Sequence, residues 1–354
     1  MDFLASAAIA ATFTLTCAFL VAQVAAAADN VHGSGGVSTT PRAAKPSAAA
    51  PVVIPSPIAA SFVFNSAQYA TGGVALRNRR TGGIEVSGAV SPIKAAYIYW
   101  AVMPRGAGRS IRLTRTFPGP AAFKDLTGTE VGHGPSPCWN PPGSTTTISV
   151  YRAAVPLNVA NGNGSYTVNL TGASGLTGGE DPWSAPVVFP LFEGASLVIV
   201  GTGASTVALY DNKDPSDPNQ GISGHFFNAG DGISYSLQLP NPVSGGPVLF
   251  DNIGADGQHG AGRGDIAAVS REVTTINGVK IAGPGSPAND TDWNGSAGFP
   301  LPQLWDDTGH DVTAAAKAGT ARLDVSISAA GGPPNDCLTA VANIVSFPAA
   351  GASR

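Results

Sequence analysis

Charged side chains, histidine and cysteine are scarce in this sequence of 354 residues. Asp, Glu, Lys and Arg make up only 12% of it and the formal net charge is −4, so a basic face for nucleic acid is not expected. The histidines and cysteines are scattered singly, which leaves no pair of clusters with zinc spacing. A G-x-S-x-G turn, an H-E-x-x-H pair and a P-loop are all missing, and this excludes the enzymes that depend on them.

Long helical patterns and fixed repeats are missing as well. The 45 glycines and 29 prolines show no collagen period and indicate many short strands joined by turns. Only Asp311–Ala318 predicts a helix, a short one with Asp311 or Thr313 as its cap. We therefore predict an all-β protein, an antiparallel β-sandwich of jelly-roll-like or Greek-key type with very little helix.

Apolar and aromatic runs define the strongest strands. Ile93–Met103 carries three large aromatic residues that suit a packed sheet. In Glu193–Asn212, two β-branched runs flank Gly201–Gly203, which predicts a β-hairpin. Both faces of its first run are apolar, so this strand is expected inside a sheet covered on both sides. Thr339–Phe347 predicts the last strand.

Two neighbouring segments in the N-terminal half differ in their pattern. Ile111–Phe117, which contains Arg112 and Arg115, alternates in polarity and predicts an exposed strand. Residues 118–144 are rich in proline and glycine and predict turns.

The N-terminal residues predict export. Residues 1–28 are apolar and end in small residues before Asp29, which is typical of a cleaved signal peptide; an uncleaved membrane anchor is the alternative. Residues 29–58 are rich in Ala, Ser, Gly and Pro and predict a flexible linker. Residues 59–350 predict a single large β-sandwich domain, or two packed sub-sandwiches. We expect the mature protein to be secreted or at the cell surface, without membrane insertion.

Two cysteines remain after the predicted cleavage, Cys138 and Cys337. In an exported protein such a pair can form one disulfide. The bridge would close a loop of about 200 residues, which the chain-entropy model values at roughly 4–5 kcal/mol. The alternative is two thiols that never meet.

Calcium is the one candidate cofactor. The loop after the predicted hairpin offers the oxygen ligands that Ca²⁺ prefers, from Asp211, Asp214, Asp217 and Asn219. Their spacing does not match an EF-hand. Asp and Asn are also ordinary turn formers, so a loop without calcium is the alternative.

A glycine-rich segment carries two further candidates. Arg263 and Asp265 form an Arg-Gly-Asp tripeptide, a candidate ligand contact that matches by chance in many proteins. Asp251, Asp256, His259 and Asp265 can supply an acid and a base, as glycosidases require two carboxyl groups. A solvated loop is the alternative, and we assign no catalytic residue.

Tryptophans in loop-like surroundings are candidate contacts for sugar rings. The alternative is that they plug the ends of a sandwich, where large rings bury much area. Trp100 lies on a predicted strand and favours the core. For the others both interpretations stay open, and the candidate ligand contacts among them are Trp139, Trp183 and Trp293.

Several short motifs occur in a characteristic order. They are KAAYIYWA from Lys94, PCWN from Pro137, YRAAV from Tyr151, GNGSYTV from Gly162, EGASLVIV from Glu193, LWDDTGHDVT from Leu304 and NDCLTAVANIVSF near the end. Together they resemble a loose group of secreted or cell-surface prokaryotic β-sandwich domains of unassigned function, some in adhesin-like proteins.

This resemblance implies an exported non-enzymatic protein for surface interaction or adhesion, with a surface glycan or protein as its partner. A secreted carbohydrate-active hydrolase or lyase on the same scaffold is the first alternative. The second is a structural matrix or filament subunit that assembles through an exposed strand edge.

Overall fold

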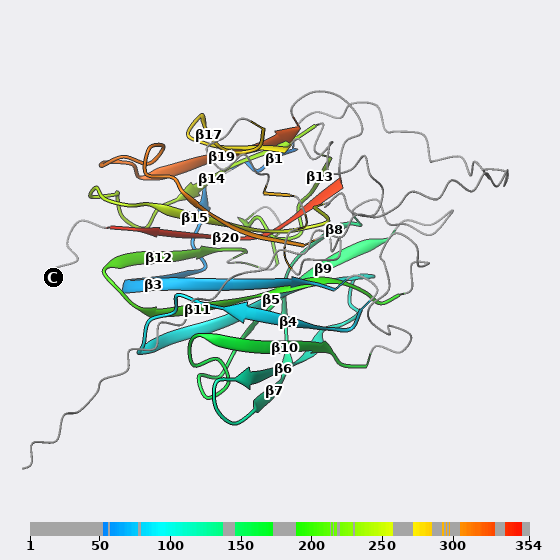
Figure 1. Cartoon of the computed structure of the whole chain (residues 1–354). Helices are drawn as coiled ribbons and strands as arrows, with labels where there is room; N and C mark the ends of the chain where they lie inside the picture. The colour runs from blue at the N-terminus through cyan, green and yellow to red at the C-terminus, as the bar shows by residue number, and fades with distance from the viewer. Residues whose placement is uncertain are drawn as a thin grey trace, which may run out of the picture. The chain divides into compact units, whose positions relative to one another are not determined.

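The computed structural model describes residues 52–55, 57–76, 79–136, 146–172, 189–212, 214, 216–217, 220–228, 231–257, 272–284, 292–293, 295, 297, 305–329 and 337–348. All of them belong to one compact unit, Ser47–Arg354. Within these residues the fold consists of strands, turns and loops with no α-helix, which confirms the all-β prediction (Figure 1). This part of the chain accordingly holds no helix with the length and apolarity to cross a membrane.

Two smaller sheets form the outer layers. The β14 sheet has six strands: β1 (Val52–Val53), β2 (Ile58–Ala59), β14 (Ile233–Gln238), β19 (Arg322–Ala329), β16 (Glu272–Ile276) and β17 (Val279–Ala282). The β10 sheet has four strands, in the order β4 (Thr81–Val86), β10 (Gly164–Leu170), β6 (Ser110–Phe117) and β7 (Ala122–Thr127).

The central sheet has ten strands. Its order is β18 (Trp305–Asp311), β15 (Leu249–Ala255), β20 (Cys337–Phe347), β12 (Ser205–Tyr210), β3 (Phe62–Ala75), β11 (Leu191–Thr202), β5 (Ile93–Met103), β9 (Thr147–Ala154) and β8 (Thr129–Pro135), while β13 (Phe226–Asn228) pairs with β20.

Three hydrophobic clusters show how these sheets stack. One joins the β14 sheet to β12, β15 and β20. A second joins the β10 sheet to β3, β5, β9 and β11. The third lies between the two portions of the central sheet, which therefore face each other as two inner layers. Alternation along each inner strand supplies both neighbouring clusters: in β11, Leu197 belongs to the second cluster and Val198 to the third. Both faces of β11 are thus covered, as its apolar run predicts.

The predicted hairpin at Glu193–Asn212 is wrong, because β11 and β12 do not pair with each other. β3 lies between them in the sheet order (Figure 1): its residues 67–75 pair with β11 and its residues 62–67 with β12. Ser66, with φ of 50°, separates the two segments of β3, and Gly203 N–H donates to Ser66 O (3.0 Å). A strand far away in sequence thus takes the hydrogen bonds that a hairpin would have used.

The predicted helix at Asp311–Ala318 is also wrong. Asp311 ends β18, and its carboxylate accepts from the backbone N–H and the hydroxyl of Thr313, which favours a turn. A single turn follows, in which Val312 O accepts from the backbone N–H groups of Ala315 and Ala316. Gly319, with φ of 89°, then changes the direction of the chain. Residues 118–144, expected as turns, contain β7 and β8.

Candidate functional site

The outward face of the β10 sheet carries the most distinctive exposed group of the described residues. Along β6, Ile111 and Leu113 point into the second cluster, so Arg112 and Thr114 point outward. The register then aligns Arg112 with Asn169 on β10 and Asp125 on β7. The neighbouring row aligns Thr114 with Thr167 and Phe123. The face is therefore a regular grid of hydroxyl, amide and charged groups beside one phenyl ring.

Arg112 connects the polar and the aromatic parts of this face. Its Nε and Nη2 donate to the two oxygens of Asp125 (2.7 and 2.8 Å), and its guanidinium carbon lies 4.7 Å from the centre of the Phe123 ring. Hydrogen bonding to the guanidinium lowers the pKa of Asp125, and the same bond raises the pKa of Arg112. The fork is thereby held over the ring while both groups stay exposed.

In the described part of the chain, exposed phenyl rings occur on β6 and β7. Among the described residues, the large hydrophobic side chains that are exposed include two aromatic ones, Phe117 (64%) and Phe123 (59%). Phe117 ends β6 and Phe123 lies on β7, the last strand in the order of this sheet. Burying a phenyl ring gains about 1.5–3 kcal/mol, and these two rings leave that free energy unused, which makes them candidate contacts for a ligand.

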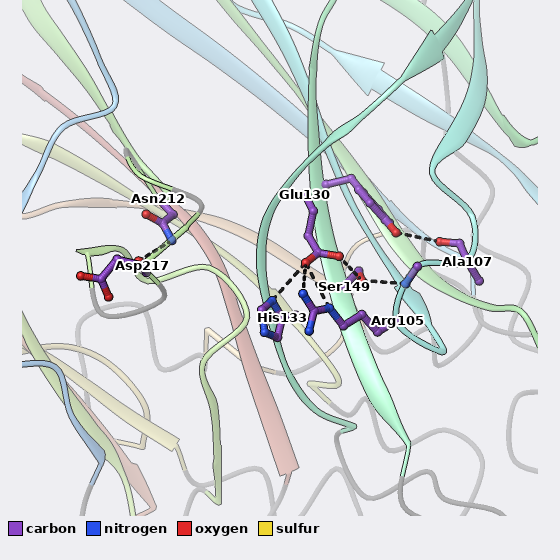
Figure 2. Close-up of polar contacts among 9 residues, drawn as sticks. Arg105, Ala107, Glu130, His133, Ser149, Asn212 and Asp217 are labelled. Carbon is purple, nitrogen blue, oxygen red and sulfur yellow. Dashed lines mark hydrogen bonds and ion pairs between the residues drawn. The ribbon is translucent and has the colours of Figure 1, made fainter.

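A second, partly buried cluster surrounds Glu130 on β8. Figure 2 shows Arg105, His133 and Ser149 converging on its carboxylate, at 2.9, 3.0 and 2.9 Å. Burial raises the pKa of Glu130, but the hydrogen bonds from Ser149 and Arg105 outweigh it and leave the pKa below its ordinary value. Because both oxygens are engaged, Glu130 ties β8 to β9 and to the turn after β5.

Asp211, a predicted calcium ligand, is buried and already satisfied by protein donors. Its carboxylate pairs with Arg152 and accepts from Ser61, from the Tyr99 hydroxyl (2.9 Å) and from the backbone of Asn212. The Asp211 side chain therefore links the end of β12 to β5 and β9.

In the loop that follows, the oxygens of Asp214 and Asp217 accept hydrogen bonds that stabilise turns. Asn212 donates to Asp217 O (3.2 Å; Figure 2), and Asp214 accepts from the backbone N–H and the hydroxyl of Ser216 (3.0 and 2.6 Å). The hydroxyl bond lowers the pKa of Asp214. Over the described ranges, no three or more His, Cys, Asp or Glu side chains are placed to hold a metal. Asn219 lies outside those ranges, so calcium binding stays a prediction.

Trp293, a candidate ligand contact, is fully buried. Its ring meets Phe227 edge-on at 5.4 Å and fills the space beside Gly254, where an added Cβ would lie 2.0 Å from the indole. Trp305 is also fully buried and donates to Ser196 Oγ (3.0 Å). Both rings are core residues. In this position the Trp293 ring packs in the core, as the alternative interpretation expects, and it offers no exposed face to a sugar.

The remaining candidates lie largely outside the described residues. These are Cys138, Trp139, Trp183, His259, Arg263 and Asp265. Cys337 is described and is buried at the start of β20. Its bridge to Cys138 therefore stays a prediction.

Asp251, proposed as an acid or base, meets a partner that the sequence did not suggest. Asp251 on β15 lies beside Asp307 on β18, with Tyr69 and Thr71 of β3 opposite them. Burial, followed by the charge of Asp307, raises the pKa of Asp251 well above its ordinary value. Burial also raises the pKa of Asp307. Two carboxyl groups so placed titrate as a pair.

Fold and site together define an all-β, layered sandwich protein with an aromatic–polar outer face. No protein-family model matches the sequence, and a search of curated proteins finds no match. Solved structures give distant matches. BuGH86 in complex with neoagarooctaose, as a variant and as wild type, has 11% identity and a TM-score of 0.26, over 81% of this chain and 33% of that one.

A recombinant peptide:N-glycanase F has 11% identity and a TM-score of 0.26, over 80% of this chain and 96% of that one. The chain spans about a third of the BuGH86 structures it matches (33%). At these scores the matches carry no argument about function.

Proposed function

We propose that this protein is an exported surface-interaction protein that binds glycans through the outward face of β6 and β7. The carrying observation is that the two exposed aromatic side chains of the described residues, Phe117 and Phe123, lie on these adjacent strands, one of them under the Arg112–Asp125 fork. Export is supported by the apolar residues 1–28.

The chemistry of this face suits a sugar. A phenyl ring offers an apolar surface to the C–H side of a pyranose, while the fork and the aligned amide and hydroxyl groups offer donors and acceptors to its hydroxyls. Asn169 and Thr167 supply such groups on the adjacent strand, half-exposed and in register with Arg112 and Thr114. A flat face of this kind holds one sugar weakly, so strong attachment requires several contacts with a polymer.

The β14 sheet provides a matched control, because it repeats the fork without the ring. Arg322 pairs with Asp324 at 2.8 Å on β19, and Asp324 accepts from Ser236 (2.6 Å). Its exposed large apolar residues among those described are Val53 (64%) and Val279 (41%), both of them aliphatic. If the charged fork alone bound a glycan, both sheets would bind it. If binding requires stacking on a phenyl ring, only the β10 sheet would bind it.

The test is a glycan array with the mature chain and four variants. Phe123→Ser and Arg112→Ala should abolish binding to the glycans that the wild type retains, and Val279→Ser and Arg322→Ala should not. Equal loss in both pairs, or retention in Phe123→Ser, would refute the proposal. The glycans that bind are then incubated with the protein and analysed by mass spectrometry. If cleavage products appear, the function is hydrolysis of the glycan and not binding alone.

A further inference from the structure

A buried carboxyl pair joins the two inner layers of the central sheet. Asp251 on β15 and Asp307 on β18 come from one layer, and Tyr69 and Thr71 on β3 come from the other. Thr71 Oγ1 donates to Asp251 Oδ2 at 3.4 Å, while Asp251 Oδ1 accepts no hydrogen bond in the described part of the chain. β18 and β3 lie against each other here, so the pair sits where the layers are held together.

The register places the two acids on the same face. Asp307 lies opposite Ile253 on β15, two residues from Asp251, so the two side chains are diagonal neighbours on the side that faces β3. On that side the strands also carry Ile253 and Trp305 of the third cluster. The described groups that reach the pair from β3 and β11 are the hydroxyls of Tyr69, Thr71 and Ser196.

The groups that face the pair are neutral or negative. From β3 comes Tyr69, whose own pKa is raised by burial and by Asp251 and Asp307. From β11 comes the Ser196 hydroxyl, and the only titratable residue of β11 is Glu193. On the opposite face of β18 lie Asp306 and His310, and His310 is paired with Asp292, whose charge reaches Asp251. Within the described residues, no cation compensates the pair.

We propose that Asp251 and Asp307 share one proton and form a latch that fastens β15 and β18 to β3, and that the latch loosens when the pH rises. With one proton, one carboxyl donates to the other across the diagonal. When that proton is lost to water, two buried negative charges face each other, and separation of β18 from β3 admits water and relieves their repulsion.

The direction of the pH dependence of stability follows from the direction of the two pKa shifts. Each folded pKa lies above that of an unfolded Asp, so the folded chain binds more protons than the unfolded chain between the two values. The stability that the pair contributes is therefore fully present at acid pH. It is lost as the pH rises through the folded pKa.

The experiment follows thermal unfolding of the full chain, as wild type and as Asp251→Asn, between about pH 5 and about pH 8. Asn mimics the protonated carboxyl, so the melting temperature of the variant should gain several degrees on the wild type as the pH rises. Asp324→Asn is the control: the pKa of Asp324 is lowered by its hydrogen bond from Ser236, so the stability that this carboxylate contributes changes only at more acid pH. The melting curve of Asp324→Asn should therefore run parallel to that of the wild type over the range tested. Parallel curves for wild type and Asp251→Asn would overturn the latch.

A second measurement keeps the test valid if Asp251→Asn does not fold. Hydrogen exchange of the wild type is followed for β18 and for β19 over the same pH range. After correction for the intrinsic rate, exchange in β18 should accelerate with rising pH and exchange in β19 should not. Equal behaviour of the two strands would overturn the proposal.

Discussion

Removing the cation that compensates Asp211 should destabilise the protein more than removing Asp211 itself. Asp211 is fully buried, whereas the Arg152 side chain is 16% exposed and its guanidinium lies 4.6 Å from the centre of the Phe62 ring. Arg152→Met leaves a carboxylate in the core with only neutral donors, from Tyr99, Ser61 and the backbone of Asn212. In Asp211→Asn the remaining guanidinium can still turn toward water.

The expected loss of stability follows from this difference in burial between Asp211 and Arg152. Breaking a buried pair costs about 3–5 kcal/mol, and because the remaining donors still bind the carboxylate, we expect about 3 kcal/mol for Arg152→Met. For a domain of this size that is a loss of about 6–12 °C in melting temperature. Asp211→Asn should cost less than half of this, and the double variant should recover part of the loss of Arg152→Met.

The assay is urea unfolding followed by tryptophan fluorescence, with Arg112→Met as the matched control. Arg112 also pairs with a carboxylate beside a phenyl ring, but the pair is exposed, so its loss should leave the transition midpoint unchanged. A loss for Asp211→Asn that equals or exceeds that for Arg152→Met would refute the reasoning, because the buried charge would then not be the dominant cost.

Three further outcomes are expected. Gly254→Ala should lower the free energy of unfolding by about 1–3 kcal/mol, measured in urea, because its Cβ would overlap the Trp293 ring, whereas Gly83→Ala meets only one atom at 4.0 Å and should be neutral. If Cys138 and Cys337 are bridged, intact mass spectrometry after alkylation should show labelling only after reduction, and Cys337→Ser should cost about 2–5 kcal/mol. Calcium at millimolar concentration should raise the melting temperature if the loop after β12 binds it; no shift removes that site.

The local pattern of apolar residues predicts several strands correctly. It does not predict the pairing of strands whose partners are distant in sequence. Ile93–Met103 is β5 with the predicted bounds, and the predicted last strand Thr339–Phe347 lies within β20. The pairing of β11 with β12 was wrong, because the strand between them comes from residues 62–75. Adjacent apolar runs joined by glycine indicate a turn, but they carry no information about a third strand.

The candidate sites show the same limit. Asp251 was recognised as a titratable residue, but its partner Asp307 is set by the register between β15 and β18. The sequence predicts an exposed strand for the segment that contains Arg112. For the segment that contains Phe123 it predicts turns, because that segment is rich in proline and glycine. The alternation in β7, where only Leu126 is buried, is too short to stand out in sequence.

The place of β20 has a consequence for how the chain can fold. β20 is the last described strand, yet it pairs with β12 on one side and β15 on the other. Until it is present, both neighbours have unpaired inner edges, and the core beneath the β14 sheet lacks one of its walls. Such long-range pairing slows folding, because chain entropy is lost before the contacts form. The neighbouring strands β12 and β15 are therefore completed only when β20 joins them, and a chain without the residues of β20 loses the centre of a layer instead of its margin.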